Sequence, residues 1–470
     1  MNLDKKLAPT IFVIFGITGD LSRKKLIPAL LDLYAKKKLP EQFMVWGFSR
    51  KPFSDEGFRI FLREALERKG HSHSDEVVSS FLHSVHYHQG TFDESACYAE
   101  LEDVLQKQDK AYGTCSNKLF YLAVPPAQYE TILTKLAHSN LTIPCGGDDG
   151  WTRVLIEKPF GRDVKTARKL DRLLGKLFNE KQIFRIDHYL AKETLQNILA
   201  FRFANGVFEP VWNRRHIESV TIRMHENNDV ATRGAFYDDI GALRDIGQNH
   251  MLQMLAVIAM DECELYEEGA IRSRRAEVFR KLEIKNISES VRAQYEGYRD
   301  TEGVREGSQT ETFFRLTAFV NTHRFKGVPF LLEGGKALSR SFAEIDIHFK
   351  NSPATHFQIP EGVGNCRNTL TFRVQPNESI ELVFWAKKAG LSKELERKTF
   401  TFNYAEQMQG QADAYEKVLL DAVHGDQTLF ASTDEVLYSW KFITPILEKW
   451  SHLPLQVYKQ GSDGSELKSN

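Results

Sequence analysis

The apolar run at residues 11–15 (IFVIF) leads directly into the glycine turn GITGDL and then into a helical pattern over residues 22–34. A continuous run of β-branched and aromatic residues is typical of a strand buried on both faces, as in a parallel sheet. Strand, glycine turn and helix in this order can bind a phosphate, because backbone N–H groups at the helix N-terminus approach the anion. The glycine spacing is G-x-x-G, so a tight turn without a ligand is as good an interpretation of this segment alone.

The same arrangement recurs along the first part of the chain. Further short apolar runs, each stopped by a polar, proline- or glycine-containing turn, lie at residues 43–48, 119–124, 153–156 and 183–186. Repeated buried strands of this kind, with mostly helical and polar sequence over residues 51–117, predict an open parallel sheet whose ligand lies at the strand C-termini. We therefore expect a Rossmann-like, doubly wound α/β domain over residues 1–187.

Beyond residue 200 the pattern changes to that of an antiparallel sheet. Runs with strand character lie at residues 218–225, 312–320, 344–349, 369–374 and 380–385, and helical patterns lie at 243–260 and 412–423. The alternation TLTFRV in residues 369–374 is typical of a strand with one exposed face. The sequence predicts an α+β domain with an antiparallel sheet over residues 188–470, ending in a frayed tail from residue 460.

Composition and charge exclude several classes of protein. The 470 residues are too many for one ordinary core and suggest two domains. Apolar residues make up 42% and charged residues 27%, as in soluble globular proteins, and a net charge of −1 provides no global basic field for nucleic acid or an anionic membrane. No apolar stretch is long enough to span a bilayer, and the N-terminus lacks a signal-peptide pattern. We expect a cytoplasmic protein.

Neither the cysteines nor the histidines predict a cross-linked or metal-binding protein. The five cysteines lie far apart with no C-x-x-C pair, which indicates free thiols in a reducing compartment rather than a disulfide framework. Histidines between residues 71 and 88 show H-x-H and H-x-x-H spacings, but no cysteine lies among them and the nearby acids are ordinary surface residues. We expect no metal site.

The sequence RIDHYLAKE at residues 185–193 contains a candidate phosphate site. Asp187 and His188 follow the last predicted strand, and Lys192 comes four residues after His188, so His188 and Lys192 would share one face of the helix that follows. Imidazole, phenol and ammonium groups from His188, Tyr189 and Lys192 would together hold a phosphate. The competing interpretation is a solvated helix start capped by Asp187.

Ser49 and Arg50 follow the second predicted strand. In dinucleotide-binding folds a carboxylate near this position binds the ribose 2′-OH of NAD, whereas an arginine accommodates the 2′-phosphate of NADP. Arg50 without a neighbouring acid therefore favours NADP, and a solvent-facing arginine is the alternative. Two lysines could also reach the cleft: Lys25, in the first helical turns, and Lys158, whose bond to the following proline could be cis.

The most apolar helical pattern in the chain contains His250. Spacings of three or four residues place His250 on the same inward face as Leu243 and Met254. A core histidine bonded to a carbonyl is the usual explanation, but Asp245 lies at the same end of the helix, and buried polar groups need partners. A carboxylate that held one tautomer would make His250 a general base, and Asp187 is our candidate for that carboxylate.

Taken together, these segments resemble the glucose-6-phosphate dehydrogenase family. The matching stretches follow the family's order over nearly the whole chain: residues 16–25 (GITGDLSRKK), 157–161 (EKPFG), 185–193, 244–250 (RDIGQNH), 335–338 (GKAL), 373–377 (RVQPN) and 413–416 (DAYE). The resemblance implies oxidation of β-D-glucose 6-phosphate at C1 to 6-phospho-D-glucono-1,5-lactone in the pentose phosphate pathway, with hydride transfer to NADP⁺. It also implies a large antiparallel sheet in the second domain and a homodimer, sometimes a dimer of dimers.

Carried over by position, the resemblance assigns roles to individual residues. His250 takes the proton of the C1 hydroxyl, and Asp187 orients His250. The implied contacts to the phosphorylated sugar are Lys25, Lys158, His188, Tyr189, Lys192, Glu226, Asp245, Lys336 and Gln375. The implied contacts to the cofactor are Gly16, Thr18, Gly19, Asp20, Leu21, Arg50, Tyr121 and Lys158.

The chain departs from the family pattern at a few positions. Ile17 and Thr18 stand in the glycine turn where the family often has alanine and serine, and Glu333 and Ser341 replace basic residues. The aromatic tail that grips a second, structural NADP in some members is missing, so we expect that second site to be absent. Two other functions stay open: a hexose-6-phosphate dehydrogenase with broad sugar or NAD preference, and a catalytically silent NADP-binding or regulatory protein.

Overall fold

The structure is a computed structural model that describes residues 8–145, 150–263, 268–351, 357–359, 366–404 and 413–468. The chain divides into two units, and each is formed by more than one stretch of sequence. The first unit comprises Met1–Gly161, Lys165–Ala191 and Ala412–Thr433, and the second comprises Arg162–Val164, Lys192–Gln411 and Asp434–Asn470. The division expected at residue 187 lies close to the change after Ala191. Ala412–Thr433, here called the return segment, belongs to the first unit, although its sequence lies within the part expected to form the second domain.

The first unit is built on a seven-stranded sheet in the order β16-β6-β5-β4-β1-β2-β3. Its strands are β1 Thr10–Phe15, β2 Phe43–Ser49, β3 Val85–Gln89, β4 Asn117–Leu122, β5 Thr152–Ile156, β6 Ile183–Ile186 and β16 Phe430–Ala431. All neighbouring strands are parallel except β16 and β6. Every residue of β1 is buried, as expected for an apolar strand in the middle of a parallel sheet.

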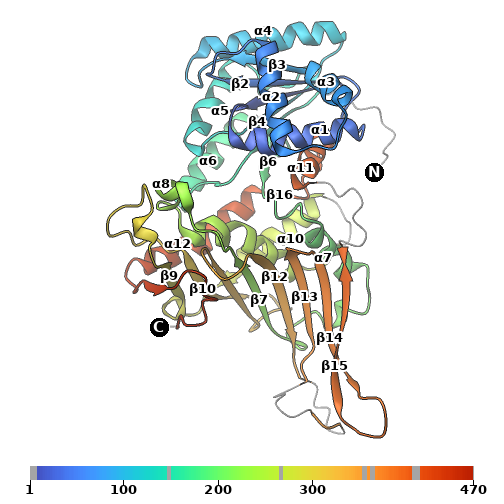
Figure 1. Ribbon diagram of the computed structural model, residues 1–470, viewed down its shortest axis with the longest axis vertical. Helices are drawn as coiled ribbons and strands as arrows, with labels where there is room; N and C mark the ends of the chain where they lie inside the picture. Colours follow the sequence, from blue (N-terminus) through green and yellow to red (C-terminus); the bar gives the residue numbers. More distant parts are fainter. Residues whose placement is uncertain are drawn as a thin grey trace. The chain divides into compact units, whose positions relative to one another are not determined.

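The helices of the first unit surround this sheet (Figure 1). They are α1 Ile27–Ala35, α2 Asp55–Lys69, α3 Asp75–His83, α4 Ser95–Tyr112, α5 Tyr129–His138, α6 Val164–Leu177 and α11 Ala414–His424. The chain runs outward from β1 to β3 and then returns to β4 on the other side of β1. The C-terminal ends of β1 and β4 therefore form a topological switch point, where open α/β sheets bind ligands. The expected doubly wound, Rossmann-like fold is confirmed.

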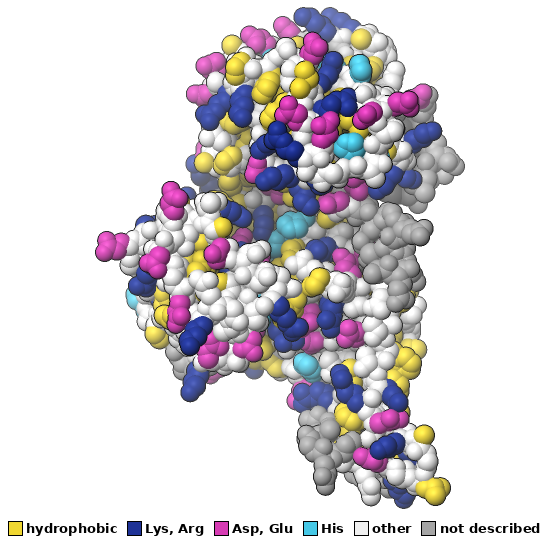
Figure 2. Space-filling model, viewed as in Figure 1, with side chains coloured by type: hydrophobic (Ala, Val, Ile, Leu, Met, Phe, Trp, Pro, Cys, Tyr) yellow, Lys and Arg dark blue, Asp and Glu magenta, His cyan; other side chains and the backbone are white. Residues whose placement is uncertain are grey.

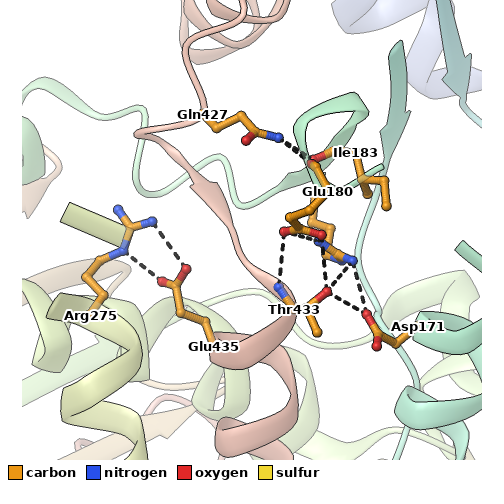
Figure 3. A network of polar contacts seen from close by, with 8 residues as sticks. Asp171, Glu180, Ile183, Arg275, Gln427, Thr433 and Glu435 are labelled. Atoms are coloured by element: carbon orange, nitrogen blue, oxygen red, sulfur yellow. Dashed lines mark hydrogen bonds and ion pairs between the residues drawn. The ribbon is translucent and has the colours of Figure 1, made fainter. Parts of the chain in front are cut away.

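Polar contacts fasten the return segment to the first unit. Arg185 in β6 is 2% exposed, and its guanidinium donates to the Glu180 carboxylate (2.9 Å) and to the Thr433 hydroxyl (2.8 Å). The Gln427 amide donates to the backbone carbonyls of Glu180 (2.8 Å) and Ile183 (2.9 Å), as Figure 3 shows. β16 extends the sheet by pairing with β6. The return segment thus completes one edge of the first unit.

The second unit is built on a ten-stranded sheet in the order β15-β14-β13-β12-β7-β11-β10-β9-β17, with β8 paired to β10. Its strands are β7 Ile217–His225, β8 Leu282–Glu283, β9 Val291–Tyr295, β10 Phe313–Val320, β11 Pro329–Gly335, β12 Phe342–Phe349, β13 Thr369–Gln375, β14 Ser379–Lys387, β15 Leu395–Asn403 and β17 Gln456–Tyr458. Two pairs are parallel, β7 with β11 and β9 with β17. Figure 1 shows β12 to β15 side by side. The expected large, mostly antiparallel sheet is confirmed.

The helices of the second unit are α7 Glu193–Phe203, α8 Gly234–Tyr237, α9 Leu252–Ala259, α10 Glu268–Arg280 and α12 Thr433–Trp450. A π-helix over Leu243–Met251 leads into α9, and all residues of α9 are buried. The π-helix packs on β7 and β11. A buried ion pair between Arg275 and Glu435 (2.7 Å) joins α10 to α12 (Figure 3).

The expectation of a frayed C-terminal tail is wrong for residues 460–468. The guanidinium of Arg315 in β10 donates to the backbone carbonyls of Gly464 and Leu467, each at 3.1 Å. Leu467 is 4% exposed and belongs to a buried apolar cluster that also contains Phe313 and Tyr458. The tail is anchored because an arginine more than a hundred residues earlier satisfies its carbonyls.

The expectation that all the cysteines are free thiols is also wrong. Cys115 and Cys145 form a disulfide, with their Cα atoms 5.5 Å apart. Cys115 lies just before β4, and Cys145 lies in the turn region that leads to β5. β4 and β5 are adjacent and parallel, so the segments that enter them lie at the same edge of the sheet. Cys97, Cys263 and Cys366 are free.

Candidate functional site

In the glycine turn after β1, the backbone of Gly16 closely approaches the backbone of Ala123. Gly16 has φ +79°, and a Cβ atom at this position would lie 2.4 Å from the Ala123 carbonyl oxygen. The Gly19 N–H donates to the Gly16 carbonyl (2.9 Å), and the Thr18 and Ser49 hydroxyls are 2.9 Å apart. Only glycine fits at residue 16, because a side chain there would be both strained and obstructed. The turn lies at the switch point of the sheet.

Arg50 lies directly after β2 and is exposed. Among the residues that the structure describes, Arg50 has no acidic partner, so its guanidinium is available to an anion. Asp20 differs in this respect, since its carboxylate accepts hydrogen bonds from Arg23 and from Lys24 (2.9 Å). These two cations lower the pKa of Asp20, and Lys24 has the larger effect.

A carboxylate surrounded by phenols lies at the ends of β4 and β5. The Tyr121 hydroxyl donates to the Glu157 carboxylate (2.6 Å), and the Tyr129 hydroxyl donates to the Glu157 carbonyl (2.9 Å). Exclusion of water raises the pKa of Glu157, although hydrogen bonds from Tyr121 and Tyr415 act in the opposite direction. Lys158 follows, and its bond to Pro159 is cis, as the sequence allowed.

Tyr415, from the return segment, was not among the expected site residues. Its ring stacks on His188 with the ring centroids 6.3 Å apart, and the Lys25 ammonium lies 6.0 Å from the centroid of the Tyr415 ring. Lys25 also pairs with Asp413 (3.3 Å). The structure therefore brings Lys25 and His188 to the same aromatic ring. The DAYE motif in the sequence could have indicated Tyr415 as a site residue.

Residues 187–192 form a turn rather than the start of a helix. The Tyr189 N–H donates to one carboxylate oxygen of Asp187 (3.0 Å), and the Leu190 N–H donates to the Asp187 carbonyl (3.0 Å). α7 begins at Glu193, and Lys192 is its N-cap. The expectation that His188 and Lys192 share one helix face is therefore wrong, because the Asp187 side chain stabilises a turn there.

Three expected sugar contacts meet in the second unit. Lys336 follows β11 and Glu226 follows β7, and these parallel neighbours bring the two residues to the same sheet edge. The Lys336 ammonium pairs with the Glu226 carboxylate and also with Asp245 on the π-helix (3.5 Å). Their side chains are 13%, 36% and 21% exposed respectively, so this carboxylate–lysine cluster is open to solvent on one side.

His250 lies on the same π-helix as Asp245 and is 2% exposed, so its expected burial is confirmed. The winding differs from the α-helix that the apolar spacing predicted. Gly247 lies in the middle of the π-helix, and a Cβ atom there would come within 2.7 Å of the Leu243 side chain and 2.9 Å of the Phe314 ring. π-turns are frequently found at functional sites.

Buried polar groups hold the π-helix in place. The Glu311 carboxylate accepts the Leu243 N–H (3.0 Å), and burial raises the pKa of Glu311. The Gln248 amide donates to the Ser439 hydroxyl in α12 (2.7 Å). Glu311 was not among the expected site residues, because it lies far from the π-helix in the chain.

Gln375 does not join the carboxylate–lysine cluster through the sheet. It ends β13, and β12 lies between β13 and β7, a backbone separation of about 10 Å.

Among the described residues, no group of three or more His, Cys, Asp or Glu side chains is arranged to hold a metal ion. No helix in the described ranges is long and apolar enough to cross a membrane. Figure 2 shows acidic and basic side chains interspersed over the visible face of each unit.

Two family models match consecutive parts of the chain. Residues 13–197 match "Glucose-6-phosphate dehydrogenase, NAD binding domain", and residues 199–470 match "Glucose-6-phosphate dehydrogenase, C-terminal domain". A glucose-6-phosphate 1-dehydrogenase of Chlamydia pneumoniae is 38% identical over 485 residues, covering 99% of this chain and 94% of the relative. Its counterpart from Treponema pallidum is 39% identical over 478 residues, covering 97% and 92%.

Solved structures of glucose-6-phosphate dehydrogenases are also similar to this chain. A glucose-6-phosphate dehydrogenase in complex with its substrate glucose 6-phosphate has a TM-score of 0.90 and 32% identity, covering 98% of this chain and 96% of that chain. The glucose-6-phosphate 1-dehydrogenase of Mycobacterium avium has a TM-score of 0.83 and 30% identity, covering 97% and 95%. The likeness extends over both units.

Proposed function

Because the chain belongs to the glucose-6-phosphate dehydrogenase family, we propose that it oxidises β-D-glucose 6-phosphate at C1 to 6-phospho-D-glucono-1,5-lactone, with NADP⁺ as the oxidant. The observation that carries this proposal is that one member of the carboxylate–lysine cluster lies on the helix of His250. Asp245 and His250 belong to one π-helix. A sugar whose hydroxyls were bound by Glu226, Asp245 and Lys336 would therefore have a buried imidazole close by.

We propose that the cofactor binds at the switch point of the first unit. The residues present fit a dinucleotide, because the turn at Gly16 packs tightly against Ala123 at the switch point of the sheet, and Arg50 offers an exposed guanidinium without an acidic partner among the described residues. Gly16, Thr18, Gly19, Asp20 and Leu21 would line the pyrophosphate, with Tyr121 and Lys158 nearer the reacting end. Arg50 would hold the 2′-phosphate, which distinguishes NADP from NAD. When bound, the nicotinamide would accept a hydride from C1 of the sugar.

His250 is the proposed general base, and Asp187 is the proposed carboxylate that orients it. The imidazole would take the proton of the C1 hydroxyl while the C1–O bond becomes a carbonyl. Burial of both residues supports this assignment, since His250 is 2% and Asp187 3% exposed. The Tyr189 N–H also holds the Asp187 carboxylate in a fixed orientation. An oriented base contributes about 10²–10⁴ in rate.

The phosphate of the sugar is assigned to His188, Tyr189 and Lys192. All three follow the end of β6, and Lys192 is the N-cap of α7, where backbone N–H groups and the helix dipole favour an anion. Lys25 would add a further positive charge, and Gln375 would contact the sugar. From the family we also propose a homodimer or dimer of dimers in the cytoplasm.

The reaction is tested by absorbance at 340 nm with glucose 6-phosphate and either nucleotide. We expect reduction of NADP⁺ with a higher kcat/KM than for NAD⁺, and a lower kcat/KM for galactose 6-phosphate. Equal efficiency with both sugars or with NAD⁺ would instead support a hexose-6-phosphate dehydrogenase of broad preference. If the protein binds NADP⁺ but the absorbance does not change, the result would support the alternative of a catalytically silent NADP-binding protein.

A further inference from the structure

Tyr237, at the end of α8, has a buried hydroxyl that none of the described residues satisfies. The residue is 3% exposed, and its phenol oxygen has no hydrogen-bond partner among the residues that the structure describes. A buried hydroxyl without a partner is costly, and native proteins usually avoid it. Such a group requires an explanation, and a ligand that binds next to it provides one.

The surroundings of Tyr237 are the carboxylate–lysine cluster. The Lys336 ammonium lies 5.2 Å from the centroid of the Tyr237 ring. Burial, together with the nearby charges of Asp245, Glu311 and Glu226, raises the pKa of the Tyr237 phenol well above its usual value. The phenol therefore keeps its proton at neutral pH, and it can serve as a donor.

Hydrogen bonds to Asp238, the next residue, fix the position of Tyr237. Asp238 accepts hydrogen bonds from the Tyr298 hydroxyl (3.0 Å), the Ser308 hydroxyl and the Arg305 guanidinium (2.7 Å). The rings of Tyr237 and Tyr298 also pack edge to face, with their centroids 6.3 Å apart. The position of the Tyr237 hydroxyl is thus set before any ligand arrives, which lowers the entropic cost of using it.

We propose that Tyr237 is a further substrate-binding residue, whose hydroxyl donates a hydrogen bond to a ring hydroxyl of the phosphorylated sugar held by Glu226, Asp245 and Lys336. This inference rests on the proposed function. Two carboxylates against one ammonium give the cluster a net negative charge, which repels a phosphate and suits the neutral hydroxyls of a sugar ring. Glu226 and Asp245 can accept from these hydroxyls, and Tyr237 supplies a neutral donor.

The test compares Tyr237→Phe with Tyr98→Phe in α4 of the first unit. Both substitutions remove one buried hydroxyl, but among the described residues the Tyr98 hydroxyl has a partner, the Phe92 carbonyl (2.9 Å), whereas the Tyr237 hydroxyl has none. We expect Tyr237→Phe to keep or raise the melting temperature of the free enzyme and to raise the Kd for glucose 6-phosphate, measured by calorimetry, about 3- to 10-fold. Tyr98→Phe should lower the melting temperature and leave that Kd unchanged.

A cycle with 2-, 3- and 4-deoxyglucose 6-phosphate locates the contact. For one of these analogues, the effect of Tyr237→Phe on the Kd should disappear, because the sugar hydroxyl and the phenol are lost from the same hydrogen bond. Three results would overturn this inference without affecting the proposed function. Wild type and Tyr237→Phe could have equal Kd values for glucose 6-phosphate, Tyr237→Phe could weaken the binding of every analogue equally, or Tyr237→Phe could fail to fold. A wild-type protein that neither binds nor oxidises glucose 6-phosphate would overturn the proposed function as well.

Discussion

A buried polar side chain has to be matched by a partner, and this requirement governs the chemistry of single residues in both units. Asp187 is 3% exposed and already accepts the Tyr189 N–H. His250 is 2% exposed and is followed in sequence by a helix whose residues are all buried. An imidazole in such surroundings gains a charge at a cost unless a carboxylate compensates. Substitution of either residue should therefore affect proton transfer more than substrate binding.

His250→Asn should lower kcat by about 10²–10⁴, because asparagine can fill the space but cannot accept a proton. KM for glucose 6-phosphate should change little, since a general base at this position, as proposed, would act mainly in the transition state. Initial rates at 340 nm measure both constants. His216→Asn, on a residue that precedes β7 and has no proposed role, is the control. A kcat within tenfold of wild type for His250→Asn would exclude His250 as the base.

At the scale of elements, the strands of the first unit could be predicted because continuous apolar runs such as β1 are buried on both faces. β3 was missed, since its sequence VHYHQ carries two histidines and lacks that run. The π-helix was missed because apolar residues three or four apart suit an α-helix equally well. Of the expected sugar contacts, the meeting of Glu226 with Lys336 could not be derived from the sequence, because it depends on the pairing of β7 with β11.

The close approach of Gly16 to Ala123 can be tested by substitution. Gly16→Ala should destabilise the protein and raise KM for NADP⁺, because the Cβ atom would meet the Ala123 carbonyl. Gly113 is the matched control: it also has positive φ, at the C-cap of α4, but nothing lies within 4 Å of its Cβ position. Gly113→Ala should cost only about 1–2 kcal/mol of backbone strain. Urea unfolding measures both, and equal losses would show that the close approach is unimportant.

α11 should make stability depend on pH. Burial raises the pKa of Asp421 from 3.8 to about 6, against the opposing charge of Lys417. The folded state therefore binds the proton more tightly than the unfolded state. The stability that the protonated Asp421 side chain provides is complete below pH 3.8 and is lost as the pH rises through about 6. The loss amounts to up to about 3 kcal/mol.

Asp421→Asn removes this loss, so the melting temperature of the variant relative to wild type should increase between pH 4 and pH 7 and then level off. Differential scanning calorimetry across this range measures the change. Asp103→Asn, at an exposed position of α4, should show no such trend. A constant difference between Asp421→Asn and wild type would show that the carboxylate is not destabilised by burial.

At the scale of the whole molecule, the first unit depends on links between distant parts of the chain. The disulfide spans a sequence separation of 30 residues, for which loop-closure entropy predicts about 3–4 kcal/mol of stabilisation. The double variant Cys115→Ser, Cys145→Ser should lose stability of this order in urea unfolding, and reductant should destabilise wild type similarly. Cys97→Ser, which removes a free thiol, should leave the sensitivity to reductant intact. A wild type insensitive to reductant would contradict the prediction.

The return segment has a consequence for biosynthesis. A ribosome finishes nearly all of the second unit before it delivers β16, so β6 emerges long before the strand that covers its edge. During that interval the backbone N–H and C=O groups on that edge are open to wrong pairing, and Arg185 still lacks the Thr433 hydroxyl. The first unit can therefore be completed only after most of the second unit has been synthesised. A gene fragment that stops at residue 191 should yield an aggregating polypeptide.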